Sequence, residues 1–277
     1  MLDLRDSPLG VFDSGVGGLT VLRELQRSLP HEDFLYLGDT ARVPYGSKPA
    51  EMVREFAREI SWALIDRDVK GIVIACNTAS ATSLPELADH LPVPVWGVIE
   101  PGVRAAAASG GTGRIGILGT VSTIRSRAYQ SRLEALGLET WARACPLFVP
   151  IVEEGVSDTE IAELVARHYL GDRPPLGAVI LGCTHYPVLK GTLQTVLGAR
   201  VELVDSAEST AATVAGDLEK MGLTSPRERE GRIHHLVTGD LDSYLHTARV
   251  LGGPEGTAER LALPLGPRDA ALSSTIG

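Results

Sequence analysis

Two cysteines occupy positions where chemistry is expected in an α/β protein. Cys76 follows the apolar run of residues 71–75, and Cys183 follows the apolar run of residues 177–182. Such runs, bounded by glycine, are typical of buried parallel strands, and open α/β sheets bind their ligands beyond the carboxyl ends of these strands. A helix expected just beyond Cys183 would place its positive N-terminus near the thiol and favour the thiolate. We therefore predict that both thiols are reactive.

A glycine loop follows the first predicted strand. Residues 9–12 form the strand, residues 13–18 read Asp-Ser-Gly-Val-Gly-Gly, and a helix is predicted over residues 19–29. The loop partly matches a dinucleotide-binding fingerprint, but Thr20 stands in place of the third glycine and Asp13 adds a carboxylate. Loop N–H groups could instead hold a small carboxylate while Asp13 meets an ammonium group. This pattern favours an amino acid over a nucleotide.

A second polar loop, residues 38–46, follows the strand predicted at residues 34–37 and offers backbone donors and the Tyr45 hydroxyl. The remaining pattern alternates strands and helices, which indicates an α/β protein with mostly parallel, doubly wound sheets. Further strands are predicted at residues 114–119, 201–206 and 233–237, and further helices at residues 47–64 and 207–221.

The two halves of the chain share a spacing. Cys76 lies 66 residues after Gly10 in the first strand, and Cys183 lies 67 residues after Gly116 in the strand that opens the second half. This spacing predicts an architectural repeat, in which two similar lobes face each other across one ligand cleft, each with one thiol.

The chain length supports two lobes. At 277 residues the chain exceeds the length at which a single core usually stops growing. We predict a discontinuous first domain of residues 1–97 plus 207–265, a second domain of residues 98–206, and a polar, mobile tail of residues 266–277.

Composition excludes several classes of protein. The net charge is −9 and no cluster of Lys or Arg is present, so nucleic acid is not an expected partner. The N-terminus lacks an apolar signal core, and no apolar run approaches a membrane span. The three cysteines are widely spaced and odd in number, which argues against disulfides and Cys-x-x-Cys motifs. We therefore expect a soluble cytoplasmic protein with free thiols and no membrane contact.

Two thiols on opposite faces of a tetrahedral carbon can invert it. One thiolate removes the α-proton and the other thiol returns a proton from the opposite side, with the sulfurs roughly 7 Å apart around the bound ligand. Pyridoxal phosphate would require a Schiff-base lysine, but none of the four lysines stands at a predicted strand end. We therefore predict racemisation without a cofactor and without a metal.

Several ordered motifs resemble the aspartate/glutamate racemase family, and within it the bacterial glutamate racemases. The motifs that carry this resemblance are residues 13–18, 38–46, 76–79, 100–102, 148–153 and 182–187. The resemblance implies a pyridoxal-independent homodimer of two-domain α/β subunits that converts L-glutamate to D-glutamate for peptidoglycan. It also implies that Cys76 and Cys183 are the acid/base groups, that Asp13 and His185 assist them, and that Glu153 lies nearby. The implied substrate contacts are Asp13, Ser14, Pro44, Tyr45, Gly46, Asn77, Thr78, Thr120, Thr184 and His185.

The residues beside the thiols predict unequal acidity. A cationic His185 two residues from Cys183 would stabilise its thiolate, whereas the carboxylate of Asp13 near Cys76 would favour the thiol. One proton shared between two thiols is the resting state that a racemase requires.

Other interpretations stay open at this point. Cys76, Cys183 and His185 could ligate zinc in a hydrolytic or structural site. The lobes could also form a small-molecule binding module with inert thiols. An aspartate racemase would use the same chemistry with a different side-chain pocket. Cys145 is predicted to be a small buried hydrophobic residue.

Overall fold

The strands of this protein form two parallel sheets. The computed structural model describes residues 4–109 and 113–263, and within them ten strands divide into a sheet of six and a sheet of four. All the recorded strand pairings are parallel. The predicted fold class, two parallel α/β sheets, is therefore confirmed.

The first sheet contains strands from both ends of the chain. Its order is β10-β9-β2-β1-β3-β4, and β9 pairs with β2 in the register Phe34 to Ile233. Its strands are β1 (Leu9–Asp13), β2 (Phe34–Gly38), β3 (Gly71–Ile74), β4 (Val95–Gly97), β9 (Ile233–Val237) and β10 (Thr257–Arg260).

The second sheet repeats the strand order of the first. Its order is β6-β5-β7-β8, which matches β2-β1-β3-β4. Its strands are β5 (Arg114–Gly119), β6 (Thr140–Ala144), β7 (Leu176–Gly182) and β8 (Glu202–Asp205). The strand order reverses between β1 and β3 in the first sheet and between β5 and β7 in the second. Ligands bind beyond the carboxyl ends of strands at such points. Cys76 follows β3 and Cys183 follows β7, so each thiol stands at one of these points.

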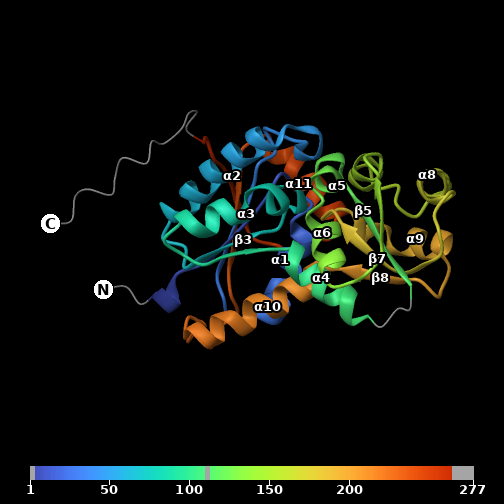
Figure 1. Cartoon of the computed structure of the whole chain (residues 1–277). Coiled ribbons are helices and arrows are strands. Elements are labelled where there is room, and N and C mark those ends of the chain that lie inside the picture. The colour runs from blue at the N-terminus through green and yellow to red at the C-terminus, as the bar shows by residue number, and fades with distance from the viewer. Residues whose placement is uncertain (1–3, 110–112, 264–277) are drawn as a thin grey trace.

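Helices cover both sheets, with α2 and α3 on one end of the molecule and α8 and α9 on the other (Figure 1). The helices are α1 (Leu19–Ser28), α2 (Ala50–Ile65), α3 (Asn77–His90), α4 (Ile99–Ala108), α5 (Val121–Ser126), α6 (Ala128–Ala135), α7 (Phe148–Glu153), α8 (Glu160–Leu170), α9 (Lys190–Leu197), α10 (Ser206–Met221) and α11 (Leu241–Val250), with short 3-10 turns at Leu4–Asp6, Tyr45–Ser47 and Tyr186–Leu189. No helix in the described ranges is both long enough and apolar enough to span a bilayer.

Strand β1 is buried on both faces. Val11 belongs to a hydrophobic cluster that includes α1 and continues to Val179 in the second sheet, whereas Phe12 packs in a separate cluster with Val53 of α2. Successive side chains of a strand point to opposite faces, which explains this division. Helix α10 packs against both α1 and α4 and so joins the two halves.

The structure extends the predicted pattern near its C-terminal end. The strand predicted at residues 233–237 is confirmed as β9, but α11 and the edge strand β10 follow it and were not predicted. The helix expected just beyond Cys183 begins only as a 3-10 turn at Tyr186, and α9 starts at Lys190. The proposed domain boundaries stay a prediction, and the tail of residues 266–277 lies outside the described residues.

A buried ion pair stabilises the end of the first sheet opposite the thiols. Lys70 precedes β3 and Glu32 precedes β2, and their side chains are 0% and 1% exposed. The Lys70 Nζ also donates to the carbonyl oxygen of Arg5 at 2.9 Å, and the backbone N–H of Ser225 donates to Glu32 Oε1 at 2.7 Å.

We expect Lys70→Met to lower the free energy of unfolding by about 3–5 kcal/mol at pH 7, because it leaves the Glu32 carboxylate buried without its cation. Urea titration followed by circular dichroism measures this loss. The matched control is Lys220→Met, which removes an exposed partner of Asp217 at 3.2 Å and is expected to cost about 0–1 kcal/mol. Equal losses of unfolding free energy in the two variants would contradict the stabilising role of the Lys70–Glu32 ion pair.

Candidate active site

A cavity of about 310 Å³ lies between the two sheets. Its lining comes from the segments that follow β1, β2 and β3 of the first sheet and β5, β6 and β7 of the second. The lining residues are Ser14, Gly15, Val43, Pro44, Tyr45, Gly46, Ser47, Cys76, Asn77, Thr78, Thr120, Val121, Pro146, Val149, Pro150, Glu153, Cys183, Thr184 and His185. Two thiols from different sheets therefore open into one space.

Cys76 is set up to remain a thiol. It stands between β3 and α3, is 5% exposed, and its Sγ lies 3.8 Å from Ser14 Oγ in a weak hydrogen bond. Burial, together with the nearby charge of Asp13, raises the pKa of Cys76 to about 12. The helix N-terminus does not overcome these two effects.

Cys183 has a cationic neighbour. Its Sγ lies 3.8 Å from His185 Nδ1, and His185 Nε2 lies 2.9 Å from Glu153 Oε1. Burial by itself would lower the pKa of His185, but the contacts with Cys183 and Glu153 raise it to about 10. His185 is therefore protonated at neutral pH and can stabilise a thiolate at Cys183, while Glu153, with 41% of its side chain exposed, connects this group to solvent.

Asp13 lies behind the cavity wall. Its side chain is fully buried, Oδ2 accepts from the backbone N–H of Gly15 at 2.9 Å, and Oδ1 accepts from Thr184 Oγ1 at 3.4 Å. Burial raises the pKa of Asp13, and the charge of His185 opposes that rise. Asp13 does not line the cavity, so the predicted direct contact with an ammonium group has no support from the geometry. Asp13 acts on the cavity through its charge, which raises the pKa of Cys76, and through its hydrogen bond from Thr184.

Two glycines allow the halves to approach closely. A Cβ atom at Gly17 would lie 2.3 Å from Thr184 Oγ1 and 2.5 Å from His185 Nδ1. A Cβ atom at Gly46 would lie 2.6 Å from Thr120 Cβ. Real Cβ atoms essentially never come this close to another atom. Glycine is therefore required at both positions because the opposite half leaves no room, and neither residue has a positive φ.

Hydroxyl groups join the two sheets on one side of the cavity. Thr78 Oγ1, at the start of α3, lies 2.9 Å from Thr120 Oγ1 and 3.2 Å from Thr123 Oγ1, both at the start of α5. Hydroxyls can both donate and accept, so this cluster can reorient to receive a carboxylate. The Tyr45 hydroxyl donates to buried Asp39, and its oxygen can still accept a hydrogen bond in the cavity that Tyr45 lines.

The structure brings together nearly all the residues that the sequence singled out. Of the predicted site residues, Asp13 alone does not line the cavity. Sequence reasoning did not assign the polar lining residue Ser47 or five apolar ones, Val43, Val121, Pro146, Val149 and Pro150, of which Val43, Val149 and Pro150 belong to quoted motifs. Apolar lining residues carry no distinctive chemistry, so no signal in the sequence set them apart.

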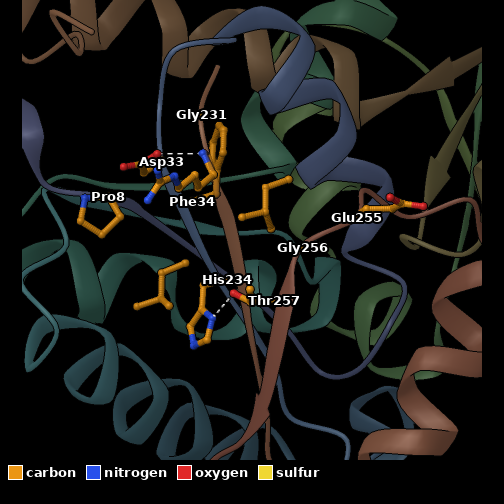
Figure 2. A pocket seen from close by; sticks show the side chains of 11 residues that line it. Pro8, Asp33, Phe34, Gly231, His234, Glu255, Gly256 and Thr257 are labelled. Atoms are coloured by element: carbon orange, nitrogen blue, oxygen red, sulfur yellow. Dashed lines mark hydrogen bonds between the residues drawn. The ribbon is translucent and has the colours of Figure 1, made fainter. Parts of the chain in front are cut away.

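A larger hollow of about 610 Å³ lies at the opposite, amino ends of β2, β9 and β10 (Figure 2). There His234 Nδ1 lies 2.6 Å from Thr257 Oγ1, and the backbone N–H of Arg232 donates to Asp33 Oδ1 at 2.7 Å. It contains none of the predicted site residues. The smaller cavity, which contains both thiols, is therefore the candidate active site.

The zinc interpretation gains no support from the geometry. Within residues 4–109 and 113–263, no group of three or more His, Cys, Asp or Glu side chains is arranged to hold a metal ion. Cys76, Cys145 and Cys183 are free cysteines.

Two matching parallel sheets that enclose one cavity, with a thiol from each sheet, have the architecture of a racemase-type isomerase. A family model described as Asp/Glu/Hydantoin racemase matches residues 17–214 of this chain. The chain belongs to the Asp/Glu/Hydantoin racemase family.

Individual relatives agree with this assignment. A protein named glutamate racemase from Thermus thermophilus is 55% identical over 258 residues, which cover 93% of this chain and 97% of the relative. The crystal structure of the Thermus thermophilus glutamate racemase with β-chloro-D-alanine has a TM-score of 0.87 and 55% identity, covering 94% of this chain and 98% of that one. The structure of a Francisella tularensis glutamate racemase with D-glutamate has a TM-score of 0.86 and 33% identity, covering 93% and 98%.

We expect iodoacetamide to modify Cys76 slowly at pH 8, because a thiol with a pKa of about 12 is ionised only to the order of 10⁻⁴ at that pH. Asp13→Asn should increase the rate several-fold by removing a nearby negative charge, whereas its oxygen can still accept from Gly15. Peptide mass spectrometry over time measures the modification of each cysteine. An unchanged rate at Cys76 would show that burial alone sets its acidity.

We also expect Glu153→Gln to lower the pKa of His185 below about 10, because it removes the carboxylate that stabilises the imidazolium. Nuclear magnetic resonance titration of ¹³C-labelled histidines measures this shift without relying on activity. His235 is the internal control, since burial lowers its pKa to about 4 and Glu153 is not among the causes of that shift. An unchanged pKa of His185 in this variant would exclude electrostatic coupling between Glu153 and His185.

Proposed function

We propose that this protein interconverts L-glutamate and D-glutamate by a two-base reaction at Cys76 and Cys183. The observation that carries the proposal is the shared cavity, which receives one thiol from the end of β3 and one from the end of β7. The relatives named glutamate racemase, and the solved relative with bound D-glutamate, support glutamate as the substrate.

The unequal environments of the thiols supply the starting state. Cys183, beside cationic His185, acts as the base that removes the α-proton of one enantiomer, and Cys76, whose pKa is raised, acts as the acid that donates a proton to the opposite face. The C–H bond breaks on one side and forms on the other, so the configuration inverts. The product leaves the two thiols with their protonation states exchanged, which is the state needed for the reverse reaction.

The cavity offers many donors for the carboxylates and for the developing carbanion. We propose that Ser14, Asn77, Thr78, Thr120 and Thr184 bind the substrate together with the backbone of residues 44–46. Such fixed donors can stabilise charge that develops in the transition state. None of the four lysines lines the cavity, which supports chemistry without a Schiff base to pyridoxal phosphate.

The biological assignment follows from the resemblance. We propose that the D-glutamate supplies peptidoglycan synthesis in the cytoplasm. We also propose that the protein is a homodimer, and sedimentation analysis would test this oligomeric state. Aspartate racemase from Picrophilus torridus is 18% identical with a TM-score of 0.56, and that likeness concerns the fold alone.

We expect Cys76→Ala and Cys183→Ala each to abolish racemisation, with a loss of at least about 10³-fold, because each removes one of two essential proton carriers. Circular dichroism at a wavelength sensitive to glutamate, starting from either enantiomer, measures the rate. In heavy water each variant should still exchange or eliminate the α-proton of one enantiomer only.

Cys145→Ala is the matched control, because Cys145 is buried and does not line the cavity. It should retain racemase activity. Full racemisation by either active-site variant would refute the two-base mechanism, and faster racemisation of aspartate than of glutamate by the unaltered protein would refute the substrate assignment.

A further inference from the structure

Tyr129 is a fully buried residue of α6 that contacts both thiol-bearing segments. Its hydroxyl donates to Asn77 Oδ1 at 2.7 Å, and Asn77 directly follows Cys76. The ring of Tyr129 also lies against Gly182, which directly precedes Cys183. A Cβ atom added at Gly182 would be 3.2 Å from Tyr129 Cε2. One side chain from the second half therefore touches the neighbours of both catalytic candidates.

The ring occupies a slot that glycine leaves open. A Cβ atom at Gly102 of α4 would lie 3.2 Å from Tyr129 Cε1, on the edge opposite Gly182. Contacts at this distance are tighter than nine in ten real Cβ contacts. Larger side chains at either glycine would displace the ring, so the position of the phenol oxygen is fixed by packing against backbone.

The hydrogen bond determines how Asn77 is oriented. Burial raises the pKa of Tyr129, so the phenol is protonated at neutral pH and acts as a donor. A donor selects the carbonyl oxygen of the Asn77 side chain. The amide NH₂ group, with two donors, is then the part of Asn77 that is free for the cavity it lines.

We propose that Tyr129 is a positioning residue of the racemase site. It holds the Asn77 amide with its NH₂ group toward the cavity, where that group binds a carboxylate of the amino-acid substrate. Its hydroxyl reaches Asn77 across the boundary between the two sheets, which couples carboxylate binding to the relative placement of the two halves. This inference rests on the proposed racemisation of glutamate.

The test is Tyr129→Phe, which keeps the ring in its slot and removes the hydroxyl. The lost bond is expected to raise KM for both L- and D-glutamate about 3- to 10-fold, with a smaller change in kcat, because the Asn77 donors contribute to ground-state and transition-state binding alike. Calorimetric titration with D-glutamate should show a similar rise in Kd.

A matched control separates positioning from stability. Tyr244→Phe removes a buried hydroxyl that lies 2.8 Å from His235 Nδ1. It should therefore lower the melting temperature about as much as Tyr129→Phe does, but leave KM unchanged. Asn77→Asp keeps an acceptor for Tyr129 but offers no donor to a carboxylate, and should raise KM even with Tyr129 in place.

A double variant completes the test. Tyr129→Phe combined with Asn77→Ala should have the KM of Asn77→Ala alone, because the hydroxyl acts through the amide. An unchanged KM in Tyr129→Phe, or fully additive effects in the double variant, would overturn the proposal. Absence of glutamate racemisation in the unaltered protein would instead overturn the proposed function, and the calorimetric Kd values would still test whether Tyr129 positions Asn77.

Discussion

The close approach of glycine backbone in the first half to side chains of the second is the constraint on which the site depends. Gly17 of the first half lies against Thr184 and His185 of the second, with no room for a side chain between them. Gly46 meets Thr120 in the same way. A thiol at the end of one sheet can share a substrate-sized cavity with a thiol from another sheet only when their loops come this close. The glycines are therefore required by the assembly of the two halves.

The same closeness creates the electrostatic asymmetry. The charge of His185 from the second half opposes the rise in the pKa of Asp13 from the first half, and the charge of Asp13 in turn raises the pKa of Cys76. Burial strengthens these effects because water does not screen them. One thiol is held in its neutral form and the other lies beside a cation. A symmetric fold thus produces two chemically different groups, which is what proton transfer in a defined direction requires.

Hydrogen bonds between the halves link substrate binding to assembly. Thr78 meets Thr120 and Thr123 across the boundary, and Thr20 Oγ1 donates to the carbonyl oxygen of Thr184 at 3.0 Å. Tyr129 reaches Asn77 across the same boundary. Groups that line the cavity are therefore oriented by residues of the opposite half. A change in the relative placement of the sheets would disturb binding and proton transfer together.

The sequence by itself determined most of the strands, the glycine loops and the position of each thiol after a strand, because buried apolar runs and the residues that end them are local features. All the residues that it predicted for the site line the cavity except Asp13. Only the tertiary structure decided that Asp13 lies behind the wall, that the Tyr45 hydroxyl is engaged by Asp39, and that Tyr129 bonds to Asn77. The contacts of Tyr129 with Asn77 and of Thr184 with Asp13 join residues 52 and 171 positions apart, and local sequence carries no signal for such contacts. Asp39 and Tyr45 are only 6 positions apart, but their bond depends on how the buried loop folds.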